Sequence, residues 1–165
     1  MKKALLVIDM QNVSVGKNHA SYFKYDCEKL IGAVNGVIDE NSGNLVIYVK
    51  NVMKKNLITR FFYPFHAYPD TMEAELADEL KIVSDYVIEK YSQDAFSNER
   101  LNQLLDANQI ECVEVVGVDG GACLSATAIG AVKAGYEVIF RKEAIGTMFV
   151  GKMKKRLRKW EICEA

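Results

Sequence analysis

Apolar and polar positions along the chain alternate between short continuous apolar runs and longer periodic stretches. The apolar runs, typical of buried strands, cover residues 4–8, 44–50, 85–90, 112–118 and 137–142. Stretches typical of helices lie between them, at residues 26–40, 71–80, 97–108 and 124–135. Gly135 is expected to end the last of these helices as its C′ residue.

This alternation of strands and helices predicts a parallel sheet with helices on both faces. The expected fold is a three-layer α/β/α Rossmann-like sandwich, with a mostly parallel sheet of five or six strands. At 165 residues, of which 50% are hydrophobic, the chain suits one compact domain spanning residues 1–165. No linker, repeat or low-complexity segment divides it.

Composition narrows the classes of partner. A formal net charge of −1 gives no general attraction to nucleic acid or membrane. The apolar stretch near the N-terminus ends at Asp9, so it predicts a first strand and not a signal peptide. The cysteines form no CxxC pair and suggest neither a disulfide framework nor a zinc site: Cys27, Cys112, Cys123 and Cys163. A cytoplasmic location is therefore expected.

Three chemically distinct side chains follow predicted strands. Asp9 ends the first strand, Lys90 ends the third, and Cys123 comes just after the fourth. In open parallel sheets the ligand crevice lies beyond the carboxyl ends of the strands. The sequence therefore predicts that these three side chains meet at one edge of the sheet.

Cys123 stands between a Gly-rich turn at residues 117–122 and a helix rich in small residues. Free N–H groups and the helix dipole at such a position favour the reactive thiolate. A buried core cysteine is the alternative. Asp9 can accept the thiol proton, or it can simply cap a helix. Lys90 can stabilise both anions, or it can be a solvated lysine in a polar loop.

Three segments, VIDMQN, EKYSQDAF and VVGVDGGACLSATAIGAVKAGYEV, together resemble the isochorismatase-like cysteine hydrolases, over residues 4–143. That family includes nicotinamidases and N-carbamoyl amide hydrolases. The resemblance implies an Asp9–Lys90–Cys123 triad, a cis peptide bond between Val118 and Asp119, and an oxyanion hole lined by the N–H groups of Asp119 and Cys123. It also implies thiolate attack on an amide or carbamoyl carbon, followed by hydrolysis of a thioester.

The chain departs from the family in places that concern the substrate. Metal-binding nicotinamidases resemble one another in a DxHxxxH-like cluster after the second strand, where this chain has His66 as its only nearby histidine. No metal and no other cofactor are therefore expected. Gly120 and Gly121 replace the threonine and Asp or Asn of many relatives, which predicts a looser turn or a different substrate group. Isochorismatases that cleave an enol ether characteristically lack the cysteine, so Cys123 argues against that reaction.

Candidate substrate-binding residues come from three segments. The aromatic segment 61–66 is either a satellite core or subunit contact, or a pocket wall with Tyr63 and His66 as hydrogen-bonding groups. Phe96 belongs to the second matching motif. Gln11 follows Asp9 and can orient substrate or support the site from behind. Six of the eight residues 152–159 are basic, which favours a solvated helix face over a nucleic-acid patch.

The function favoured by these residues is a metal-independent cysteine hydrolase that cleaves a C–N bond of a small amide, imide or carbamoyl substrate. A non-catalytic binding protein on the same fold and a nicotinamidase-type activity are the alternatives. A thiol redox role lacks a second cysteine near Cys123 in sequence. The expected partner is a small molecule, with no nucleic acid or membrane, and relatives suggest a homo-oligomer, either a dimer or a tetramer.

Overall fold

A computed structural model describes residues 1–162 and 165. Within them, five strands form one sheet in the order β3-β2-β1-β4-β5, and every neighbouring pair is parallel. The strands are β1 (Lys3–Ile8), β2 (Leu45–Asn51), β3 (Val87–Lys90), β4 (Cys112–Gly117) and β5 (Glu137–Ile145). The helices are α1 (Asn12–Val15), α2 (Cys27–Glu40), α3 (Leu57–Phe62), α4 (Glu99–Ala107), α5 (Ser125–Lys133) and α6 (Val150–Lys159), with short turns η1 (Ala95–Ser97) and η2 (Gly120–Leu124). The predicted α/β/α architecture is confirmed.

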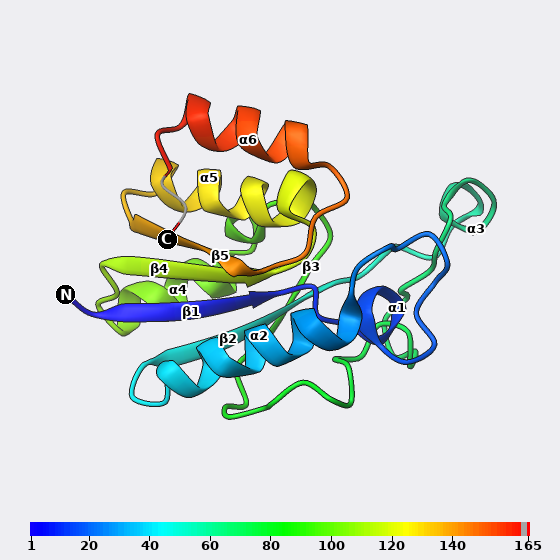
Figure 1. Ribbon diagram of the computed structural model, residues 1–165, viewed down its shortest axis with the longest axis horizontal. Helices are drawn as coiled ribbons and strands as arrows, with labels where there is room; N and C mark the ends of the chain where they lie inside the picture. Colours follow the sequence, from blue (N-terminus) through cyan, green and yellow to red (C-terminus); the bar gives the residue numbers. More distant parts are fainter. Residues whose placement is uncertain (163–164) are drawn as a thin grey trace.

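Both faces of the sheet are covered, which explains why the strands are apolar without alternation. Along β1, Leu6 and Ile8 pack into the core that includes residues of α4, α5 and α6. Leu5 and Val7 point the other way, into the core formed with α2. Figure 1 shows α5 and α6 on one side of the sheet and α2 on the other.

The registers of the central strands bring their carboxyl ends together. Ile8 of β1 pairs with Gly117 of β4, and Asn51 of β2 pairs with Lys90 of β3. The strands therefore end at a common edge, where the segments after β1, β2, β3 and β4 meet. The short helix α3 projects beyond this edge (Figure 1).

One predicted helix is wrong. Residues 71–80 form turns and an antiparallel bridge between Gln11 and Leu76. The N–H of Asn12 donates to the carbonyl of Glu75 at 2.8 Å, and the N–H of Ala77 donates to the carbonyl of Met10 at 2.9 Å. Backbone bonding to the segment after β1 thus replaces the helical ladder that the local pattern predicts, because tertiary partners outweigh weak propensity.

The end of α5 follows the prediction at Gly135. This residue has φ of 91°, and its N–H donates to Val132 while the N–H of Tyr136 donates to Ala131. These two bonds are those of a Schellman motif with glycine at C′. Among the helices of residues 1–162, none is long and apolar enough to cross a membrane.

Candidate active site

Asp9 and Lys90 form a buried ion pair at the carboxyl edge of the sheet. The Lys90 Nζ lies 3.0 Å from the Asp9 Oδ2, and it also donates to Asn51 Oδ1 at 3.3 Å and to the Ser92 carbonyl at 3.2 Å. These three acceptors use all three protons of an ammonium. Lys90 is 1% exposed and Asp9 is 7% exposed. The register of β2 and β3, which places Asn51 beside Lys90, holds the amine in this position.

Cys123 completes the cluster, since its thiol interacts with both the Asp9 carboxylate and the Lys90 ammonium. Burial raises the pKa of Asp9, although Lys90 opposes this. Burial lowers the pKa of Lys90, but the two neighbouring acids outweigh it and the pKa is raised. Burial and the Asp9 charge raise the pKa of Cys123 to about 12.

This raised pKa opposes the lowered pKa that the position of Cys123 after a Gly-rich turn predicts. The helix dipole does not outweigh the loss of solvent around the sulfur and the nearby carboxylate. Asp9 Oδ2 accepts from Lys90, whereas Oδ1 is buried and has no regular hydrogen bond among the described residues. This second oxygen is a candidate acceptor for the thiol proton of Cys123.

The raised pKa of Cys123 makes a direct prediction for alkylation by iodoacetamide. Only the thiolate reacts, so the rate at Cys123 should rise about tenfold per pH unit from pH 6 to pH 10, without a plateau. Peptide mass spectrometry of alkylated protein measures this rate, with the Cys123→Ala variant identifying the modified peptide. A rate that is already maximal at pH 6 would show that a thiolate is the resting form.

Asp9 has a backbone conformation that few residues other than glycine adopt. Its φ is 53°, although it directly follows the last residue of β1. Its N–H donates to the Val49 carbonyl at 2.8 Å, and its own carbonyl accepts from Ser14 Oγ at 2.7 Å. The surrounding hydrogen bonds therefore hold Asp9 in the left-handed region, which directs its carboxylate to Lys90 and Cys123.

The turn between β4 and α5 is held by the Asp119 side chain and by the backbone. Oδ1 of Asp119 accepts from the Gly121 N–H at 2.7 Å, and Oδ2 accepts from Tyr25 Oη at 3.0 Å. The peptide bond between Val118 and Asp119 is cis. Within residues 119–124, four N–H groups already have acceptors: those of Gly120, Gly121, Ala122 and Leu124. The remaining two N–H groups, those of Asp119 and Cys123, are the ones that the resemblance to the family assigns to an oxyanion hole.

The glycine pair in this turn is closely packed, in contrast to the looser turn considered from the sequence. A Cβ at Gly120 would lie 2.6 Å from the Met153 sulfur, and a Cβ at Gly121 would lie 2.6 Å from Phe149 Cβ. Glycines here allow the segment before α6 and the first turn of α6 to approach the turn that carries Cys123.

A cavity of about 650 Å³ opens above the cluster, with Asp9, Cys123 and Asp119 among its lining residues. Aromatic side chains form much of its wall: Tyr22, Phe23, Tyr25, Tyr63, Phe65, Tyr91 and Phe149. Phe23 and Phe65 pack against each other with ring centroids 4.8 Å apart. The size and lining suit a small molecule with an apolar portion.

The other residues proposed from the sequence divide into two groups. Gln11 and Tyr63 line the cavity, but the Gln11 side chain is fully engaged with the backbone of Asn51 and Ala74. His66 does not line it, because its Nε2 bonds to the Thr59 and Arg60 carbonyls. Phe96 packs against Tyr136 and the core on the α5 side of the sheet. His66 and Phe96 thus lie outside the cavity lining.

Three residues of the site escaped the sequence reasoning. The position of Asn51 beside Lys90 can be inferred only once β2 and β3 are known to pair. Tyr25 reaches Asp119 from the segment before α2. Arg156 is part of the basic stretch, and its guanidinium bonds to the turn before Cys123. No local signal distinguishes Tyr25 or Arg156 from its neighbours.

The donor set does not suit a metal ion. Within residues 1–162 and 165, no group of three or more His, Cys, Asp or Glu side chains could hold one. Asn51 ends β2 and Met53 follows it, in the region where the metal-binding nicotinamidases are expected to have their ligands. His19 bonds to the Gly16 carbonyl. Cys163 lies outside the described residues.

The fold and the polar cluster define an α/β protein with a buried Asp–Lys pair beside a cysteine, at the carboxyl edge of a parallel sheet. The isochorismatase domain model matches residues 3–161. The chain therefore belongs to the isochorismatase family of hydrolases, which includes amidases and nicotinamidases. No curated protein sequence matches it.

Several solved structures are similar over nearly their full length. N-carbamoylsarcosine amidase from Thermoplasma acidophilum is 28% identical, with a TM-score of 0.83, and the match covers 98% of this chain and 94% of that one. Pyrazinamidase of Pyrococcus horikoshii, solved with zinc, is 24% identical, with a TM-score of 0.84 and coverage of 98% and 95%. Nicotinamidase/pyrazinamidase from Bacillus subtilis is 22% identical, with a TM-score of 0.79 and the same coverage. The last two similarities concern the fold alone.

Proposed function

We propose that this protein is a metal-independent cysteine hydrolase that cleaves a C–N bond of a small amide, imide or carbamoyl compound. The observation that carries the proposal is the buried contact of 3.0 Å between Lys90 Nζ and Asp9 Oδ2, beside the Cys123 thiol in a cavity. The desolvation of a buried ion pair can cost as much as the attraction gains, so such a pair is weak evidence for a role in stability. Groups with perturbed pKa values in a cleft are typical of active sites.

The first chemical step joins the Cys123 sulfur to the carbonyl carbon. As the S–C bond forms, the thiol proton moves to Asp9. The Asp9 carboxylate is thereby neutralised while a negative charge develops on the carbonyl oxygen. The total charge of the cluster and the substrate therefore stays constant, so no second buried anion is added. The carbonyl electrons move to oxygen, and the N–H groups of Asp119 and Cys123 stabilise the resulting oxyanion.

The intermediate then collapses with cleavage of the C–N bond. Asp9 returns its proton to the departing nitrogen, which leaves as ammonia or an amine. Water attacks the thioester carbon with Asp9 as the base, the C–S bond breaks, and the thiol is restored. The raised pKa of Asp9 improves it as a base near neutral pH. The relative of highest identity reported above is an amidase for a carbamoyl compound, in accord with this reaction class.

A panel of small amides tests the proposal. It includes N-carbamoyl amino acids, a cyclic imide, simple carboxamides and nicotinamide, each assayed for ammonia or amine release. At least one member should be turned over, and Cys123→Ala should reduce its kcat by about a thousandfold or more, because it removes the nucleophile. Ser21→Ala, which changes an exposed hydroxyl outside the cavity lining, is the matched control. Turnover that survives in Cys123→Ala, or no turnover of any member, would favour a binding protein on the same fold.

A further inference from the structure

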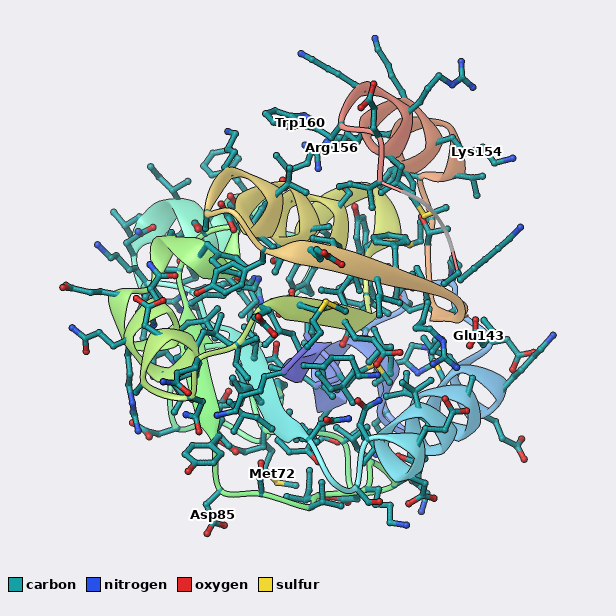
Figure 2. All side chains as sticks on the ribbon, turned by 90° about the vertical axis from the view of Figure 1, so that its left-hand side faces the viewer. Met72, Asp85, Glu143, Lys154, Arg156 and Trp160 are labelled. Carbon is teal, nitrogen blue, oxygen red and sulfur yellow. The ribbon has the colours of Figure 1, made fainter. Side chains whose placement is uncertain are left out.

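We infer that Arg156 is a positioning residue for the reaction, which orients and polarises the backbone N–H of Cys123 as an oxyanion donor. The inference rests on the proposed hydrolase chemistry and adds to it a residue from the C-terminal helix. Arg156 lies on the side of α6 that faces α5, whereas Lys154 points away from that helix (Figure 2). Its Nη1 donates to the Ala122 carbonyl at 3.0 Å and to the Gly121 carbonyl at 3.3 Å.

Peptide geometry links this contact to the nucleophile. The carbonyl of Ala122 and the N–H of Cys123 belong to one planar peptide unit, and in a trans unit these two groups point in opposite directions. Because the carbonyl points to Arg156, the N–H, which lies in the same plane, points away from α6. Ala122 and Cys123 both border the cavity. The Ala122 carbonyl also accepts from the N–H and the Oγ of Ser125, so Arg156 shares with Ser125 the role of holding the direction in which the Cys123 N–H can donate.

The charge of Arg156 adds to this geometric effect. Its partners in the turn are three neutral oxygens, since it also donates to Ser125 Oγ at 3.1 Å. Among the described residues it forms no ion pair, so no carboxylate offsets its positive charge. A cation bonded to a carbonyl oxygen draws electrons from the peptide unit and makes the N–H on its far side a stronger donor. That donor is one of the two N–H groups proposed to stabilise the oxyanion.

The surrounding packing keeps Arg156 in place. Met153 and Leu157, on either side of it in α6, are buried in the core that includes residues of α5. The Gly120 N–H donates to the Gly146 carbonyl at 2.9 Å, which ties the same turn to the segment before α6. The other basic side chains at residues 152, 154, 155, 158 and 159 are exposed. Of these exposed residues, Lys152 lies at the cavity, whereas the guanidinium of Arg156 bonds to the turn.

Two reactions of Cys123 separate this role from general support of the turn. p-Nitrophenyl acetate acylates the sulfur: the S–C bond forms, the bond to nitrophenolate breaks, and the thiol proton moves to Asp9. This reaction passes through an oxyanion. Alkylation by iodoacetamide replaces iodide at a saturated carbon and forms no oxyanion. The ratio of the two rates therefore reports the oxyanion donors, and it needs no knowledge of the natural substrate.

In Arg156→Gln, the acylation rate at Cys123 should fall about 10- to 100-fold, while the alkylation rate at the same pH stays within about twofold of wild type. Arg156→Lys should recover part of the acylation rate, since it restores a cation. Arg158→Gln, on the exposed face of α6, is the matched control. Cys123→Ala supplies the background from other cysteines.

An unchanged acylation rate in Arg156→Gln would overturn the inference, and so would an equal fall of both rates, which indicates a disturbed turn. These outcomes leave the proposed hydrolase intact if wild type still turns over an amide. Conversely, a selective loss of acylation would support Arg156 even if no member of the amide panel were a substrate. The two proposals can therefore fail separately.

Discussion

Replacing Lys90 by Met should abolish amide turnover and lower the free energy of unfolding by about 3–5 kcal/mol at pH 7. The substitution leaves the Asp9 carboxylate buried without its 3.0 Å partner, and it also removes the donor to Asn51. An unpaired buried charge loses solvation that nothing else in the site restores. Urea denaturation followed by circular dichroism measures the stability, and ammonia release measures turnover.

The double variant Asp9→Asn/Lys90→Met tests whether the pair acts as a unit. It removes both charges together, so it should regain most of the lost stability while remaining inactive. Lys50→Met is the matched control on the same sheet. Lys50 pairs with Glu75 and Glu89, whose side chains are partly exposed, so its loss should cost about 1 kcal/mol at most. Equal losses for Lys50→Met and Lys90→Met would mean that burial of the pair has no special energetic weight.

The pH dependence of the Lys90→Met deficit has a definite sign. Burial raises the pKa of Asp9 in the folded protein above its unfolded value, and loss of Lys90 removes the opposing attraction. A group with a raised folded pKa contributes its full stability below the unfolded pKa, and this is lost as the pH rises through the folded pKa. The deficit should therefore be largest near pH 7 and shrink as the pH is lowered toward 5. A deficit that grows on acidification would contradict this assignment.

Gly117→Ala should lower the free energy of unfolding by about 4 kcal/mol. Gly117 has φ of 114°, and a Cβ there would lie 2.1 Å from the Ile8 carbonyl oxygen. That carbonyl is part of the β1 backbone and accepts from the Val118 N–H at 3.0 Å, so it has little freedom to move. The clash falls between Asp9 and the turn that carries Cys123, so turnover should fall together with stability.

Gly135→Ala is the matched control for this substitution. Gly135 also has a positive φ, 91°, but a Cβ there would have nothing within 4 Å. The control therefore measures the cost of the backbone conformation alone, which should be about 1 kcal/mol. The difference between the two variants measures the clash with Ile8. If both variants lose the same stability, that clash is relieved by a small movement.

The layers of the fold and the parallel sheet follow from features that can be read locally. Continuous apolar runs alternating with periodic stretches identify β1 to β5, α2, α4 and α5. The strands are easy to recognise because burial on both faces requires apolar residues at nearly every position. The segment 71–80 shows the limit of such reasoning. Its pattern is helical, yet its backbone bonds to residues after β1, and no local pattern reports a partner that far away in sequence.

The residues of the site also divide into those that a local pattern predicts and those that depend on partners distant in sequence. Asp9 follows β1, Lys90 ends β3 and Cys123 follows the turn after β4, so the rule for open parallel sheets brings them to one edge. Asn51 needs the pairing of β2 with β3, and Arg156 needs the packing of α6 against the turn. His66 and Phe96 have suitable chemistry, but their side chains are used by the α3 backbone and by the core. The ionisation of Cys123 could not be read either, since it depends on burial.

The raised pKa of the Cys123 thiol has a consequence for the oxidation of this sulfur. Peroxides attack thiolates, and conversion to sulfenic and then sulfinic acid begins from that form. A sulfur whose pKa is raised to about 12 offers almost no anion to such oxidants between turnovers. We therefore expect Cys123 to react with peroxide more slowly than a cysteine of ordinary pKa.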